Sequence, residues 1–261
     1  METIMENSSI ITLQLSFFGD YSQQDKSTSF IISLLQVLKE DNFLPQSIQN
    51  KSINPANGEV TKSDIISLDS PSTNWKIVLM NNRIDFNYVR TNQSDPAKGL
   101  DTLIVEGIKN IERVLTILNI PSSPTIGNRL AVNVQTIIEG LPDEDINKIG
   151  KKIITAPTSQ YESSLYEDWS ASVNKQIHCD INKHKKEIVN HILEIEKIVN
   201  VNKDSEKGNK AILVHNDINT IPQNSNPRFT KEDFISFIKL ETVKAFIQNS
   251  ITEISENKYE K

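Results

Sequence analysis

Apolar and polar residues alternate near the start of the chain. Between residues 11 and 17, large apolar side chains take every second position, which is the period of a strand with one buried face. Apolar residues then recur three and four positions apart over 30–38, as in an amphipathic helix. The segment 42–57 is polar and contains two prolines, so we expect a loop there, followed by a strand over 60–68.

The sharpest local pattern predicts a hairpin. Apolar residues alternate over 75–79 and again over 84–88. The pair Asn81-Asn82 between them can adopt the left-handed backbone that a two-residue turn requires. A long helix with one apolar stripe is predicted through residues 100–118.

The second half of the chain repeats this order of elements. An alternating strand is predicted at 130–134, a short helix after Pro142, and further strands at 169–177 and 211–221. The last helix is predicted to begin after Thr230, whose hydroxyl can cap it.

Residues 188–199 satisfy two patterns at once. Their apolar positions fit the spacing of a helix and also the alternation of a strand. Turn-rich segments lie on both sides, and we therefore favour the strand.

The repeated order predicts an α+β fold made of two units. Each unit is read as β-α-β-β-β-α, with a mainly antiparallel sheet covered by a long helix. The predicted units are residues 1–121 and 122–261, and Pro121 and Pro124 mark the linker between them. We expect a groove at their junction.

Composition excludes several classes of protein. The chain has only 8 glycines in 261 residues and no G-x-G-x-x-G or P-loop pattern, which argues against a nucleotide-binding enzyme. A net charge of −6 argues against broad binding of nucleic acid. The run from Asn182 to Lys186 is the best candidate for a local basic patch, and we interpret it as a solvated hairpin turn.

Further features favour a cytoplasmic protein. The single cysteine, Cys179, excludes an intrachain disulfide and fits a reducing compartment. The chain has no apolar run long enough to span a membrane, and the acidic segment 1–6 does not resemble a signal peptide.

Histidines suggest one metal-site hypothesis. If His184-Lys185 forms the turn of a hairpin, His178 lies opposite His191, and His215 on the next strand could join them. Three imidazoles on one face would suit zinc. The alternative is three ordinary half-exposed histidines, because a slip of one residue in the register destroys the cluster.

The other residues with reactive or charged side chains are predicted to have structural roles. Cys179 and His178 are neighbours on a predicted strand and point to opposite faces, so they form no catalytic pair. Arg83 and Asp85 share one strand face, which predicts an ion pair or a partner contact on the helix-free side of the sheet. The sequence therefore defines no catalytic, cofactor-binding or metal-binding residue.

The chain resembles a large family of uncharacterised bacterial proteins, sporadically distributed and often encoded in variable genomic regions. The residues that carry the resemblance are Trp75-Lys76-Ile77, Arg83-Ile84-Asp85-Phe86, Arg129-Leu130-Ala131-Val132-Asn133, Asn216-Asp217-Ile218-Asn219, and Phe246 with Ile251-Thr252 in the last helix. The genomic setting of that family implies a role in phage defence or in conflict with mobile elements. It implies no catalytic residue.

The leading functional hypothesis is a non-enzymatic interaction or regulatory protein that acts with a protein partner. A homodimer is an alternative assembly. A second hypothesis is a sensor with a small molecule in the groove between the units, lined by Trp75 or Trp169. A third is a metal-dependent hydrolase that uses His178, His191 and His215.

Overall fold

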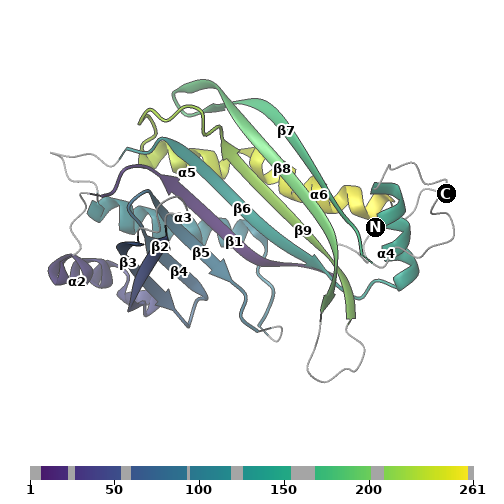
Figure 1. Cartoon of the computed structure of the whole chain (residues 1–261), viewed down its shortest axis with the longest axis horizontal. Coiled ribbons are helices and arrows are strands. Elements are labelled where there is room, and N and C mark those ends of the chain that lie inside the picture. Colours follow the sequence, from purple (N-terminus) through teal and green to yellow (C-terminus); the bar gives the residue numbers. More distant parts are fainter. Residues whose placement is uncertain are drawn as a thin grey trace.

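Nine strands form one antiparallel sheet across the described part of the chain (Figure 1). Their order in the sheet is β2-β3-β4-β5-β1-β6-β9-β8-β7. The computed structural model describes residues 7–22, 27–53, 60–92, 95–118, 126–153, 168–200 and 209–257. The strands are β1 (Ser8–Phe18), β2 (Leu44–Ile53), β3 (Val60–Ser70), β4 (Trp75–Leu79), β5 (Arg83–Val89), β6 (Arg129–Ile138), β7 (Ser170–Ile181), β8 (His184–Asn200) and β9 (Asn209–Thr220).

The described helices all pack on one side of this sheet. Side chains from each of the α-helices join a buried cluster with the strand residues that point to that side. Figure 1 shows α3, α5 and α6 behind the strands. The helices are α2 (Thr28–Val37), the single 3-10 turn η1 (Lys39–Asp41), α3 (Leu100–Leu118), α4 (Asp143–Ile153), α5 (Lys231–Lys239) and α6 (Glu241–Asn257). None of these helices combines the length and the apolar character needed to cross a membrane.

The predicted fold class of two β-α-β-β-β-α units is wrong, because the strands of both halves belong to one large sheet. β1 and β6, the first strands of the two predicted units, pair directly from Ser8↔Ile138 to Phe18↔Arg129. This pairing satisfies backbone N–H and C=O groups that each strand would otherwise leave open at a sheet edge. The two predicted units therefore meet through a hydrogen-bonded strand pair, and the expected groove is absent from this junction of described strands. The predicted linker, Pro121 and Pro124, lies outside the described residues.

Two segments differ from their predicted structure. The expected loop 42–57 contains β2, which forms one end of the sheet and, among the described strands, pairs with β3 alone. Pro45 is tolerated there because an edge strand does not need every backbone N–H for pairing. The predicted last helix is divided into α5 and α6 at Leu240, whose ψ of 127° lies outside the helical range.

Locally encoded elements are confirmed. The β4–β5 hairpin pairs from Trp75↔Tyr88 to Leu79↔Ile84, although Asn81 and Asn82 in its turn do not adopt the left-handed backbone predicted for them. The stretch 188–199 lies in strand β8. A capping box between Thr230 and Asp233 begins α5.

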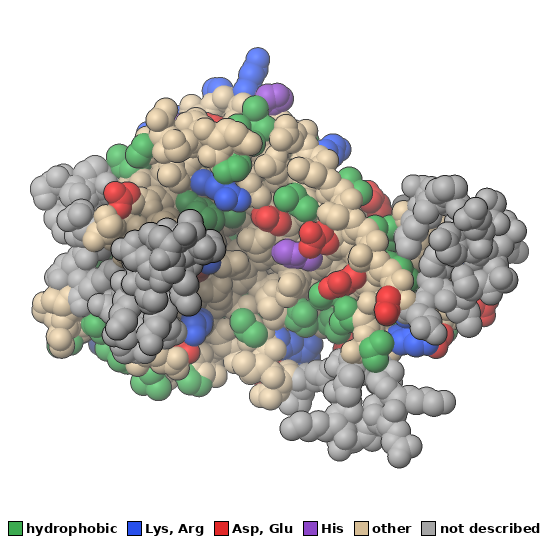
Figure 2. Space-filling model, in the orientation of Figure 1, with side chains coloured by type: hydrophobic (Ala, Val, Ile, Leu, Met, Phe, Trp, Pro, Cys, Tyr) green, Lys and Arg blue, Asp and Glu red, His purple; other side chains and the backbone are tan. Residues whose placement is uncertain are grey.

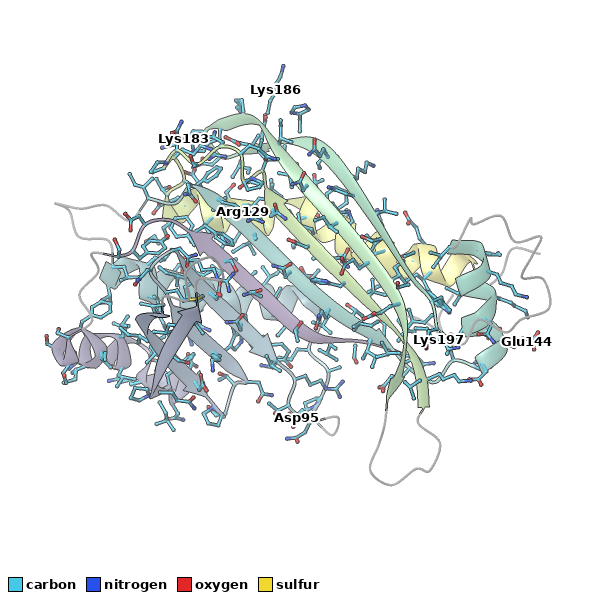
Figure 3. The ribbon with its side chains drawn as sticks, in the orientation of Figure 1. Asp95, Arg129, Glu144, Lys183, Lys186 and Lys197 are labelled. Atoms are coloured by element: carbon cyan, nitrogen blue, oxygen red, sulfur yellow. The ribbon has the colours of Figure 1, made fainter. Side chains whose placement is uncertain are left out.

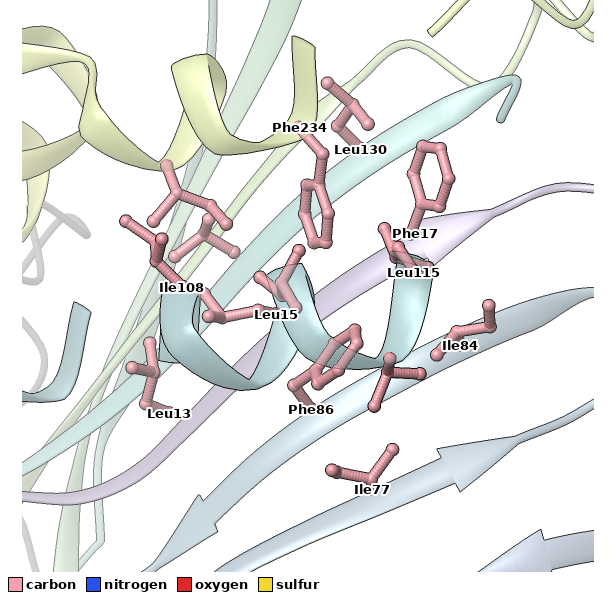
Figure 4. Close-up of a cluster of buried hydrophobic side chains, with 14 of the residues drawn as sticks. Leu13, Leu15, Phe17, Ile77, Ile84, Phe86, Ile108, Leu115, Leu130 and Phe234 are labelled. Atoms are coloured by element: carbon pink, nitrogen blue, oxygen red, sulfur yellow. The ribbon is translucent and has the colours of Figure 1, made fainter. Parts of the chain in front are cut away.

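The main core lies between the sheet and α3 and α5. Inward-facing residues of β1, β5 and β6 meet Ile108 and Leu115 of α3 in this cluster (Figure 4). Phe17 of β1 stacks on Phe234 of α5 with ring centroids 5.2 Å apart. A second buried cluster, which includes Ile138, Trp169 and Ile254, lies beneath α4 and the end of α6.

Because side chains alternate along a strand, the same strands present a second set of residues to the other side of the sheet. No described helix covers that side. We call it the open face, and Figure 2 views the molecule from this side.

Candidate functional site

The open face is lined mainly by polar side chains that stand side by side on neighbouring strands. The register of the central strands assigns these residues to it: Thr12, Gln14, Ser16 and Phe18 on β1; Arg83, Asp85 and Asn87 on β5; Arg129, Ala131, Asn133 and Gln135 on β6; His215, Asp217 and Asn219 on β9; and Asn190, Glu194 and Glu196 on β8. The alternating residues on these strands, most of which are apolar, face the helices.

An amide row crosses the centre of this face. Asn87, Gln14 and Asn133 occupy paired positions on β5, β1 and β6. The side chains of Asn87 and Asn133 make no hydrogen bond to another described residue. They line a hollow of about 450 Å³ together with Thr12, Gln135 and His215. Each amide carries both donors and acceptors, so the row can bind a ligand that presents both kinds of group.

An acidic end adjoins the amide row on β8, and we define it as Glu194 and Glu196. A second hollow of about 360 Å³ lies between these glutamates and Gln135. His215 lines both hollows, and its Nδ1 lies 3.3 Å from Glu194 Oε2. Figure 2 shows the hollowed centre of the open face with acidic side chains gathered beside it.

The opposite end of the face is cationic. Phe18 pairs with Arg83 on one neighbouring strand and with Arg129 on the other. The two guanidinium carbons lie 5.8 and 4.7 Å from the centroid of the Phe18 ring, within the range of cation–π attraction. We call these three residues the cationic end.

Asp85 fixes the position of one of these arginines. It is buried, and its Oδ2 lies 3.0 Å from Arg83 Nε, while Ser16 Oγ donates to its Oδ1 at 2.7 Å. Burial raises the pKa of Asp85, and the hydrogen bond from Ser16 and the charge of Arg83 only partly offset it. The predicted ion pair between Arg83 and Asp85 is confirmed, and it lies on the helix-free side.

The predicted pairing of His178 with His191 is wrong. The β7–β8 turn is Asn182-Lys183, between the paired residues Ile181 and His184, because Asn182 adopts the left-handed conformation with φ 50°. A bulge between Cys179 and Ile181 shifts the register again.

The three histidines therefore do not come together. His178 lies opposite Ile188, and His191 lies opposite Lys175 on the helix-covered side. His215 lies on the open face. Within the described residues, no group of three or more His, Cys, Asp or Glu side chains is placed to hold a metal ion.

The other residues considered from the sequence are largely structural. Trp75 is buried in the main core and donates from Nε1 to Glu106, and Trp169 is buried in the second cluster. Cys179 is buried as well, and burial raises the pKa of its thiol, which disfavours the reactive thiolate. Lys185, in the basic turn, pairs with Asp180.

Sequence reasoning did not identify the amide row. The signal was present, because Thr12, Gln14 and Ser16 alternate with the apolar residues of β1. That pattern marks a solvent-facing side, but it does not indicate that Asn133 of a distant strand lies beside Gln14.

Comparison with protein-family models, curated proteins and solved structures found no significant match. The resemblance to an uncharacterised bacterial family stays a prediction.

Proposed function

We propose that this is a non-enzymatic binding protein that recognises a protein partner on its open face. The observation that carries the proposal is the amide row, whose side chains line a hollow on a sheet face that no described helix covers. Polypeptides present alternating N–H donors and C=O acceptors, which Asn and Gln side chains can satisfy together.

The charges of the face support a protein rather than a nucleic acid as the partner. The hollow between Gln135 and the acidic end carries Glu194 and Glu196, which would repel a phosphate backbone. The chain as a whole has a net charge of −6. A polypeptide can place groups of either sign along its length and so match both ends of the face. A role in phage defence stays a prediction from the sequence resemblance alone.

Site-specific photo-cross-linking tests the proposal. A benzophenone amino acid replaces Asn133 in the amide row, and in a matched control it replaces Val105, which is 68% exposed on α3. In cells that naturally make the protein, we expect the probe at position 133 to cross-link one protein reproducibly and the probe at 105 not to do so.

The affinity of the cross-linked protein for the parent and for two variants then tests whether it binds at the open face. We expect Asn133→Arg to weaken binding at least about ten-fold, because a bulky charge enters the hollow. Val105→Arg should leave the affinity within about two-fold of the parent. Equal loss in both variants, or cross-linking from both sites, would contradict the proposal. Sedimentation of the purified protein would show whether the cross-linked partner is a second copy of the chain.

A further inference from the structure

The cationic end contains a guanidinium that lacks an ion-pair partner. Arg83 is paired with Asp85. Arg129 has no carboxylate within 4.0 Å among the described residues, and its Nε is buried without a hydrogen-bond acceptor. Figure 3 labels Arg129 at the start of β6, and Lys183 and Lys186 at the β7–β8 turn.

The surroundings of Arg129 disfavour its positive charge. Burial lowers the pKa of the Arg129 guanidinium. The negative charge of Asp217 opposes this shift, and the like charge of Arg83 adds to it. An oxyanion placed between the two arginines would accept hydrogen bonds from Arg129 and reduce the repulsion between the like charges.

Unpartnered acceptors lie in the next row of the open face. Asn219 is 2% exposed, and its Nδ2 donates to Asp217, but its Oδ1 has no donor. Asn190, which pairs with Asn219 across β8 and β9, also has a buried Oδ1 without a donor. Both oxygens are buried, so a partner reaches them only if the two side chains turn toward the open face, and they then require an N–H donor, which a polypeptide backbone has and a bare anion lacks.

The other end of the face has the opposite charge at a definable distance. Gln135 lies six residues after Arg129 on β6, and it pairs with His215, which pairs with Glu194. At about 3.3 Å per residue, the acidic end lies about 20 Å along the strands from Arg129. β8 also lies two strands from β6, about 10 Å to the side, so an extended chain covers the full span with about six or seven residues.

We propose that the open face binds an extended protein segment whose carboxylate contacts Arg129 and Arg83 and whose Lys or Arg, about six residues away, contacts Glu194 and Glu196. This inference rests on the proposed function and specifies the chemistry of the partner. The carboxylate comes from Asp, Glu or the C-terminus of the segment, and its backbone crosses the amide row.

A peptide-display library tests this specificity on the whole protein. Random dodecapeptides are selected for binding to the unmodified protein. We expect the enriched peptides to carry an acidic and a basic residue about six positions apart. A synthetic copy of an enriched peptide should bind Arg129→Gln about ten-fold more weakly than the parent, and Glu194→Gln should weaken it as well.

The controls separate charge recognition from damage to the fold. Lys183→Gln removes an exposed cation from the β7–β8 turn and should leave the affinity unchanged. Arg129→Lys keeps the charge but loses the planar fork of donors, so its affinity should lie between those of the parent and Arg129→Gln. Thermal unfolding of each variant shows whether it folds. If Arg129→Gln does not fold, the affinity of Arg129→Lys tests whether Arg129 binds the peptide carboxylate.

The outcomes distinguish this inference from the proposed function. Peptides that cross-link to a benzophenone at position 133 but bind Arg129→Gln and Arg129→Lys as tightly as the parent would overturn the inference and leave the proposed function standing. If neither the peptides nor the natural partner cross-links at position 133, the proposed function fails, and the inference fails with it.

Discussion

His191 shows how one residue on the covered side of the sheet connects protonation to stability. Its ring stacks on Phe246 of α6 with centroids 4.2 Å apart, and its Nε2 lies 2.8 Å from Asn216 Oδ1, a geometry in which Nε2 donates. Asn216 in turn donates to Ser250 of α6. Lys175 and Glu253 line the small pocket beside the ring. The neutral imidazole is thus part of the contact between β8 and α6.

Acid should destabilise the protein through this residue. Burial lowers the pKa of His191 below its ordinary value of 6.5, Lys175 acts in the same direction, and the hydrogen bond to Asn216 only partly opposes them. Below pH 6.5 the unfolded chain therefore binds a proton that the folded protein excludes, so the free energy of unfolding falls as pH falls. We expect the urea midpoint of the parent to drop between pH 7.5 and 5.5, and His191→Gln to show a smaller drop.

The exposed His178 provides a control for this prediction. Its Nδ1 contacts the carbonyl oxygen of Lys186 near the β7–β8 turn. His178→Gln should keep the pH dependence of the parent. The prediction is wrong if His191→Gln and the parent lose the same stability over this pH range.

At the scale of elements, α3 approaches β1 and β4 closely at a glycine. A Cβ added to Gly107 would lie 2.5 Å from Leu15 Cδ1 and 3.0 Å from Trp75 Cη2. Both of these side chains are buried in the main core and have little room to move.

Gly107→Ala should therefore destabilise the protein although alanine favours helix. The gain in helix propensity is about 1 kcal/mol, and overpacking a filled core typically costs about 1–3 kcal/mol. We expect a net loss of about 1 kcal/mol in the free energy of unfolding, measured by urea denaturation. The control is Gly99→Ala, where an added Cβ would meet nothing within 4 Å, and its stability should change by less than about 0.5 kcal/mol. Equal effects of the two substitutions would refute this account of the α3 contact.

The elements that the sequence predicts well are those whose cause is local. The β4–β5 hairpin depends on alternation over 75–79 and 84–88 with a short turn between them. The start of α5 depends on Thr230 and Asp233, only three residues apart. β2 was missed because a polar edge strand with a proline has the composition of a loop.

The candidate site was harder to predict because it depends on register between distant strands. Gln14 and Asn133 become neighbours only through the β1–β6 pairing. Alternation indicates which side of each strand is polar, but many registers satisfy that pattern equally. The same limit explains the error at His178 and His191, where a different turn and a bulge changed the pairing.

At the scale of the whole molecule, two buried clusters belong to one sheet. β6 contributes Val134 to the main core and Ile138 to the second cluster. α6 likewise contributes Ile247 to the first and Ile254 to the second. These shared elements should make the clusters unfold together.

The two tryptophans can test this cooperativity, because Trp75 lies in the main core and Trp169 in the second cluster. In Trp169→Phe only Trp75 reports by fluorescence, and in Trp75→Phe only Trp169 does. Within each variant, we expect the urea midpoint by fluorescence to coincide with that of circular dichroism, which follows the whole sheet. A fluorescence transition separated from the circular dichroism transition in either variant would show that the two clusters unfold independently.

The central place of β1 has a consequence for how the chain reaches this structure. β1 is the first described strand that the ribosome releases, but it needs partners on both sides. β5 ends at Val89, and β6 does not begin until Arg129. One edge of β1 therefore stays unpaired until β6 has been made. Such long-range pairing slows folding and exposes aggregation-prone edges, so the nascent chain should depend on chaperones more than a protein of this size with local contacts.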